Sequence, residues 1–152
     1  MPNTDSLKKN ADGLEYVSLR HPSGSLAEVY CFGGVPTRFQ DAGGTEWLTI
    51  RKDSKLDGSK PISGGMAHCF PQFGPGVLQQ HGFARNVDWE VAKLGESSVT
   101  LKLKPSAYSK GMWDKPFAAT FTVALTDYDL ETKLVVDNTG DVPFDFQAAL
   151  HR

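Results

Sequence analysis

The sequence contains little cysteine and no excess of positive charge. Its 152 residues include two cysteines, Cys31 and Cys69, which lie far apart and form no CxxC motif. A disulfide scaffold is therefore disfavoured and a reduced, cytoplasmic protein is expected, with a processed plastid protein as the alternative. The formal net charge of -2 argues against an overall basic surface for nucleic acid. It leaves room for a local basic pocket that binds a small anion.

Long apolar runs are also missing. No stretch is long and apolar enough to cross a membrane, so no membrane partner is expected. The segment 1–12 is polar and mixed in charge, without the apolar core of a secretory signal, and its acidic residues Asp5 and Asp12 argue against a transit peptide. We interpret 1–12 as a polar N-terminal extension ahead of a globular domain that spans 13–152.

Familiar catalytic and cofactor motifs are absent. The sequence has no GxGxxG after a strand, no P-loop, no GxSxG and no HExxH. These absences argue against a dinucleotide site and against the hydrolase and metalloprotease chemistry that such motifs carry. His68, Cys69 and His81 could suggest a metal, but they are scattered donors in one segment without ligand-type spacing. No metal site is predicted.

No segment has the period of an amphipathic helix, whereas apolar and polar residues often alternate. Fifteen glycines and nine prolines imply many turns. Short strands are predicted at 14–21, 26–32, 37–40 and 46–50. In the second half the residues predicted to face inward are Val99, Leu101 and Leu103, then Phe121, Val123 and Leu125, then Leu130, Leu134 and Val136, then Phe144, Phe146, Ala148 and Leu150. These patterns predict an all-β protein, an antiparallel β-sandwich.

The segment 51–86 breaks this pattern because it is rich in glycine and proline. A long irregular segment in a compact domain is usually either functional or disordered. Disorder is disfavoured because the segment contains large apolar side chains that could anchor it to the body of the protein, namely Met66, Phe70, Phe73, Leu78 and Phe83. We therefore predict an ordered loop that builds a site.

Three polar residues of this loop suit an anionic, hydroxyl-rich ligand. The Gln80 amide can both donate to and accept from a sugar hydroxyl, and His81 can exchange protons or hydrogen bonds near neutral pH. Arg85 offers a fixed fork of donors for phosphate or carboxylate. The alternative interpretation is that His81 and Arg85 only tie down the loop through backbone carbonyl groups.

His151 is the other candidate. In the alternating segment 143–152 it shares a face with Asp145 and Gln147, opposite Phe144 and Phe146. An exposed surface histidine is one interpretation of this position. The functional interpretation is a general acid or base at the surface of a sheet.

Two stretches resemble a known family. The segment LDGSKPISGG at 56–65, followed by FPQFG at 70–74, resembles the glucose-6-phosphate 1-epimerases, and so does QHGFARN at 80–86 with Trp89 just after it. These are hexose-6-phosphate mutarotases of the aldose 1-epimerase, or galactose-mutarotase-like, superfamily. The sequence of the two stretches is most similar to that of plant and algal forms. The resemblance covers residues 13 to 151.

The resemblance implies a large antiparallel β-sandwich that interconverts the α and β anomers of a hexose 6-phosphate. In this chemistry a histidine protonates the ring oxygen, a glutamate takes the proton of the anomeric hydroxyl, and no metal or organic cofactor is needed. Ala149-Leu150-His151 matches the start of the strand that carries the histidine, so His151 takes the catalytic role. Gln80, His81 and Arg85 take substrate-binding roles. Ser63 stands where many members have a phosphate-holding arginine.

The resemblance also implies a longer domain, whose second half supplies the glutamate. None of Glu90, Glu96 and Glu131 occupies a matching position. We therefore expect 13–152 to be the N-terminal half of the sandwich, inactive as it stands and able to self-associate through exposed sheet edges. The alternative is a non-catalytic carbohydrate-binding or structural module on the same fold.

Overall fold

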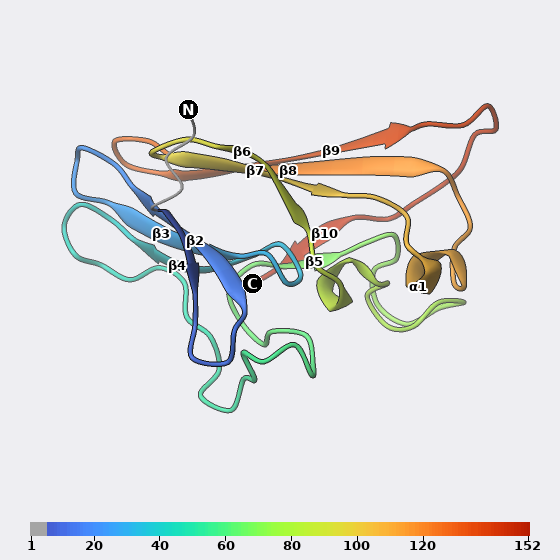
Figure 1. Cartoon of the computed structure of the whole chain (residues 1–152), viewed down its shortest axis with the longest axis horizontal. Helices are drawn as coiled ribbons and strands as arrows, with labels where there is room; N and C mark the ends of the chain where they lie inside the picture. Colours follow the sequence, from blue (N-terminus) through green and yellow to red (C-terminus); the bar gives the residue numbers. More distant parts are fainter. Residues whose placement is uncertain (1–5) are drawn as a thin grey trace.

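A computed structural model describes residues 6–152 as antiparallel β-structure arranged in three sheets (Figure 1). The first sheet has the strand order β1-β2-β3-β4 and the second has the order β6-β7-β8-β9, while β5 and β10 pair with each other. The strands of the first sheet are β1 (Leu7–Lys9), β2 (Glu15–Arg20), β3 (Leu26–Tyr30) and β4 (Val35–Gln40). Strand β1 lies within the segment interpreted as a polar extension, and it pairs with β2.

The remaining elements follow the first sheet along the chain. They are β5 (Ala67–Cys69), the 3-10 turn η2 (Ala84–Asn86), β6 (Glu90–Leu94), β7 (Ser98–Leu103), the short helix α1 (Ala107–Lys110), β8 (Phe117–Leu125), β9 (Leu130–Asn138) and β10 (Ala149–His151). The helix α1 has a capping box in which Ser106 and Ser109 bond reciprocally. Within residues 6–152 no helix is long and apolar enough to span a bilayer.

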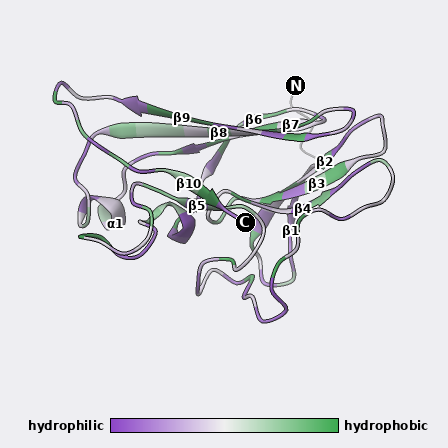
Figure 2. Cartoon of the chain, turned by 180° about the vertical axis from the view of Figure 1, so that it is seen from behind, coloured by the Kyte–Doolittle hydropathy of each residue, from purple (hydrophilic) through white to green (hydrophobic). Residues whose placement is uncertain are grey.

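The second sheet follows the alternation of its sequence. Val99, Leu101 and Leu103 are buried on one face of β7, and Phe121, Val123 and Leu125 are buried on the same face of β8. The other face carries small or polar residues, and the Thr100 and Thr122 hydroxyls bond across it at 3.0 Å. Seen from behind, apolar residues occur along the strands of both sheets and do not gather at one end of the molecule (Figure 2). This is the pattern of a sheet with one buried face.

The core forms where the first and second sheets face each other. Val17 and Leu19 of β2 and Ala27 and Val29 of β3 belong to the same buried cluster as the inward residues of β7 and β8. Two packed antiparallel sheets around one core make a β-sandwich, so the predicted all-β class is confirmed.

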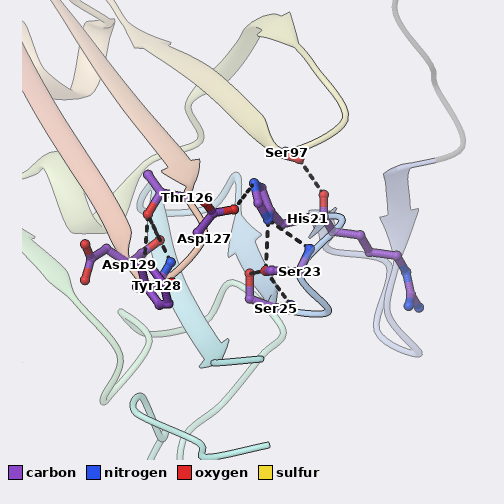
Figure 3. Close-up of polar contacts among 9 residues, drawn as sticks. His21, Ser23, Ser25, Ser97, Thr126, Asp127, Tyr128 and Asp129 are labelled. Atoms are coloured by element: carbon purple, nitrogen blue, oxygen red, sulfur yellow. Dashed lines mark hydrogen bonds and ion pairs between the residues drawn. The ribbon is translucent and has the colours of Figure 1, made fainter. Parts of the chain in front are cut away.

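Polar turns join the two sheets at one end (Figure 3). His21 Nδ1 and the Ser23 hydroxyl form a hydrogen bond of 2.8 Å. His21 Nε2 lies 3.9 Å from the Asp127 carboxylate in the β8–β9 turn. The Ser97 hydroxyl donates to the carbonyl of Arg20 at 2.7 Å. These contacts fix the turn ends of the sandwich.

The strand predicted at residues 46–50 is wrong. Residues 46–50 form isolated bridges at Glu46 and Ile50 instead of a ladder. The reason is the Asp41 side chain, which accepts from the backbone of Gly43 and Thr45 and from the Trp47 indole, so a side-chain turn shapes this segment.

The alternation predicted for the C-terminal segment is also wrong, because only β10 forms a ladder there. The Gln147 backbone donates to the Pro71 carbonyl, and its side chain accepts from the Phe73 amide, so the 51–86 loop holds this segment. Phe144 is half-buried, whereas Phe146, Ala148 and Leu150 are exposed. His151 therefore does not share one continuous strand with Asp145 and Gln147.

The loop 51–86 is ordered, but not all of its expected anchors are buried. Phe70 and Phe83 lie in the core, and Met66 packs against it. Phe73 is 55% exposed and stacks on His81 with the ring centroids 5.6 Å apart. The prediction that Phe73 anchors the loop to the core is therefore wrong. Leu78 is half-buried but lies outside the core cluster. The loop is held by Phe70, Phe83 and Met66 and by β5, which pairs with β10.

Candidate functional site

A pocket of about 430 Å³ opens beside the β5–β10 pair. Four predicted residues from two distant parts of the sequence line it together: Gln80, His81, Arg85 and His151. The other lining residues are Arg51, Ile62, Ser63, Gly64, Ala67 and Arg152. The geometry thus brings the loop candidates and the strand candidate into one concavity.

The β5–β10 pair positions His151. Its Cα pairs with that of Ala67, and both residues line the pocket. Side chains alternate along a strand, so the next residue of β5, His68, points to the opposite side and into the core. The short ladder therefore separates a pocket face from a core face.

The backbone around His81 fixes its ring. His81 has a φ of 65°, a left-handed conformation that costs energy for a residue with a side chain. Its amide donates to the Gly74 carbonyl, and its Nδ1 accepts from the Gly74 amide, both at 3.0 Å. Since Nδ1 accepts a hydrogen bond, the proton of the neutral ring lies on Nε2.

The charge state of His81 follows from its surroundings. Burial lowers its pKa, and electrostatic interactions with Arg85 and His151 lower it further. The His81 and His151 rings lie 5.6 Å apart between centroids. These effects favour the neutral His81 ring, with its proton on Nε2.

Arg85 and Gln80 complete the predicted set. Arg85 lies on η2, and its Nη2 donates to the Gln80 carbonyl at 3.1 Å. One other donor, Nε, is buried without a partner. Within residues 6–152 the Gln80 side chain makes no hydrogen bond, so its amide is free to meet a ligand.

Sequence reasoning missed Arg51 and Arg152, which also line the pocket. Arg51 pairs with Asp53 at 2.8 Å, and Arg152 donates to the Trp47 carbonyl at 3.0 Å. Arg51 stands beside Ser63, because its amide donates to the Ser63 carbonyl. The position of Arg152 next to His151 was the available signal, whereas no spacing pattern points to Arg51. The lining contains no Asp or Glu, so the pocket is cationic.

His68 and Cys69 do not line this pocket. His68 is 1% exposed, stacked on Trp89 and edge-on to Phe121, and burial lowers its pKa to about 4. Cys69 is buried too, and burial raises the pKa of its thiol. Among residues 6–152 no group of three His, Cys, Asp or Glu side chains is placed to hold a metal ion.

Comparison with known proteins agrees with this architecture. The sequence pattern of the aldose 1-epimerase family matches residues 15–152. A protein of Cenchrus ciliaris named "Putative glucose-6-phosphate 1-epimerase" is 34% identical over 95% of this chain and 48% of its own length. A protein of the same name from Escherichia coli K12 is 30% identical over 82% of this chain and 46% of its own length. The chain thus spans about half the length of these relatives.

Solved structures share the fold. A protein of Synechocystis sp. PCC 6803 superposes with a TM-score of 0.73 at 22% identity, over 92% of this chain and 51% of its own. A structure described as a putative mutarotase from Salmonella typhimurium superposes with a TM-score of 0.70 at 23% identity, over 88% of this chain and 49% of its own. At this identity the likeness concerns the fold alone.

Proposed function

Because the chain belongs to the aldose 1-epimerase family, we propose that its pocket binds a hexose 6-phosphate and takes part in interconverting the α and β anomers. The observation that carries this proposal is the composition of the pocket. Three arginines, two histidines and a free amide line it, and no carboxylate does. Such a set suits a ligand with one anionic group and several hydroxyls.

The phosphate is the natural partner of the arginines. Arg85 Nη2 donates to the Gln80 carbonyl and Nε is buried, so the donors left for a ligand are those of the terminal nitrogens Nη1 and Nη2. Arg51 and Arg152 add positive charge from the 51–86 loop and the end of β10. Ser63 carries no charge where many family members have a phosphate-holding arginine, and Arg51 and Arg152 supply that positive charge instead. A charge-assisted contact of this type contributes about 1.5–3 kcal/mol.

The histidines and Gln80 are the natural partners of the sugar. His151 would deliver a proton to the ring oxygen as the C1–O5 bond breaks, while a base removes the proton from the anomeric hydroxyl. His81 cannot be that base, because a free lone pair on Nε2 requires a proton on Nδ1, where the Gly74 amide already donates. His81 instead donates from Nε2 to a sugar oxygen.

The pocket therefore holds a candidate acid and no candidate base, since none of its lining residues is a carboxylate. We propose that these 152 residues bind the substrate without accelerating its anomerisation, and that 13–152 corresponds to the first half of a longer catalytic sandwich. The length of the relatives supports this. The same missing carboxylate favours a second candidate function, a non-catalytic carbohydrate-binding module.

Binding is tested by calorimetry with glucose 6-phosphate, glucose and inorganic phosphate. The 152-residue chain should prefer glucose 6-phosphate, and Arg85→Ala should weaken that binding by about 10- to 100-fold, with little effect on glucose. Arg20→Ala is the matched control, because Arg20 is exposed at the far end of β2. Equal losses for both sugars would refute the phosphate assignment, and binding of glucose alone would favour the carbohydrate-binding module.

Catalysis is tested by exchange NMR on freshly dissolved α-glucose 6-phosphate. Equilibration should match the rate in buffer, because a positioned acid or base contributes typically about 10²–10⁴-fold and one partner is missing. Acceleration that His151→Ala abolishes would show that the chain contains its own base.

A further inference from the structure

Strand β9 has a long free edge. It pairs with β8 along all nine of its residues, and within residues 6–152 no strand pairs with its other side. An open edge of this length is a template for pairing with another chain. It goes beyond the sugar site, because none of its residues lines that pocket.

The hydrogen bonds of the neighbouring turn show which backbone groups face outward. The Leu125 amide donates to Ser97, on the β7 side, so Leu125 and its β9 partner Leu130 form a pair without hydrogen bonds between them. The next amide, that of Thr126, accordingly donates to the Asp129 carbonyl. The free edge is therefore formed by the N–H and C=O groups of every second residue, namely Leu130, Thr132, Leu134, Val136 and Asn138.

The side chains of β9 indicate what this edge accepts. Leu134 and Val136 are partly buried against the core, whereas Lys133, Val135 and Asp137 share the outer face. Val135 is 36% exposed although it is apolar. Within residues 6–152 neither Lys133 nor Asp137 takes part in an ion pair. Across β8 they oppose Thr122 and Ala118, which carry no charge.

We propose that β9 pairs antiparallel with β9 of a second copy of this chain, about a two-fold axis at Val135. This register places Val135 against Val135 of the second copy. It also places Lys133 opposite Asp137 on both sides of the axis, as pairs without intervening hydrogen bonds, where side chains lie closest. Leu134 then opposes Val136, and their outward backbone groups exchange hydrogen bonds.

Charge favours this register over the neighbouring ones. An axis at Val136 would set Val135 against Asp137 and would form no ion pair. A two-fold axis at Leu134 would set Glu131 against Asp137, and an axis at Lys133 would set two lysines against each other; both arrangements repel. An axis at Thr132 pairs Glu131 with Lys133, but it uses only the first half of the strand. The register at Val135 extends from Thr132 to Asn138 and joins the two sheets into one.

Sedimentation and light scattering of the 152-residue chain measure the assembly. From about 1 to 100 µM its mass should rise from 16.6 kDa toward twice that value. Asp137→Lys should weaken the dimer by about tenfold or more, and Lys133→Asp/Asp137→Lys should restore it. Glu131→Gln is the matched control and should leave the dimer unchanged, because Glu131 opposes the uncharged Thr139 in this register. A wild-type chain that stays monomeric throughout would overturn the proposal.

Cross-linking tests the register and separates lost pairing from lost folding. Val135→Cys should form an intermolecular disulfide under mild oxidation, because the native cysteines are buried and this position faces itself across the axis. Thr132→Cys should not. A disulfide through Thr132→Cys but not Val135→Cys would refute the register. The Asp137→Lys chain should keep the wild-type circular dichroism; an unfolded spectrum with no recovery in the double variant would count against the proposed pair.

Discussion

Lowering the pH from 7 to 5 should destabilise the folded protein by about 2 kcal/mol through His68 alone. His68 lies in the core at 4.8 Å from Trp89 and 4.3 Å from Phe121, measured between ring centroids. Its Nε2 has no partner. Burial lowers its pKa from 6.5 to about 4, and the Gly34 backbone, which favours the protonated ring, offsets only part of this effect. A proton therefore binds the unfolded chain more readily than the folded one.

The sign follows from this difference. Well above pH 6.5 the ring is neutral in both states, and protonation of His68 does not affect the free energy of unfolding. As the pH falls toward 4, the unfolded state takes up the proton and the folded state does not, so stability declines. The full decline is about 3 kcal/mol, and about 2 kcal/mol of it occurs between pH 7 and pH 5.

Urea denaturation followed by tryptophan fluorescence measures the effect. The informative quantity is the difference in unfolding free energy between wild type and His68→Phe, because the remaining histidines titrate in both proteins and cancel. This difference should shift in favour of the variant by about 2 kcal/mol from pH 7 to pH 5. His68→Leu, which packs differently but does not titrate either, should show the same shift. Parallel pH profiles for the three proteins would refute the reasoning.

Two further outcomes concern the loop that builds the pocket. Gly82→Ala should destabilise the fold by at least about 2 kcal/mol, because Gly82 has a φ of +72° and an added methyl would lie on the Phe70 carbonyl oxygen. Gly74→Ala, at a φ of +73° with open space around it, should lower the free energy of unfolding by about 1 kcal/mol in the same urea assay. Equal losses of stability in the Gly82 and Gly74 variants would show that the clash with Phe70 does not contribute. In NMR titrations the His81 ring should titrate below pH 6.5, and Arg85→Ala should raise its midpoint, because that guanidinium helps to lower the pKa of His81; an unchanged midpoint would separate the two residues electrostatically.

Local chemistry in the sequence determined most of the strands. In β7 and β8 one face of each strand lies on the core and the other faces outward, so the alternation of Val99, Leu101 and Leu103 with polar residues specifies the buried face without knowledge of the partner strand. The motifs around Gln80 and His151 likewise identified residues that share the pocket, because a ligand site needs particular functional groups.

Only the tertiary structure decided where contacts between distant residues replace local preference. Residues 46–50 have the composition of a strand, yet the Asp41 carboxylate accepts hydrogen bonds from the Thr45 amide and the Trp47 indole and holds the segment in a turn. Phe73 has the composition of an anchor, yet it stacks on the His81 ring outside the core. Arg152 joins the pocket because β10 returns to β5 from a distant part of the chain, and Arg51 joins it because its amide bonds to Ser63 within the loop. Contacts between residues that are distant in the sequence depend on the path of the whole chain, which cannot be inferred from a local pattern of side chains.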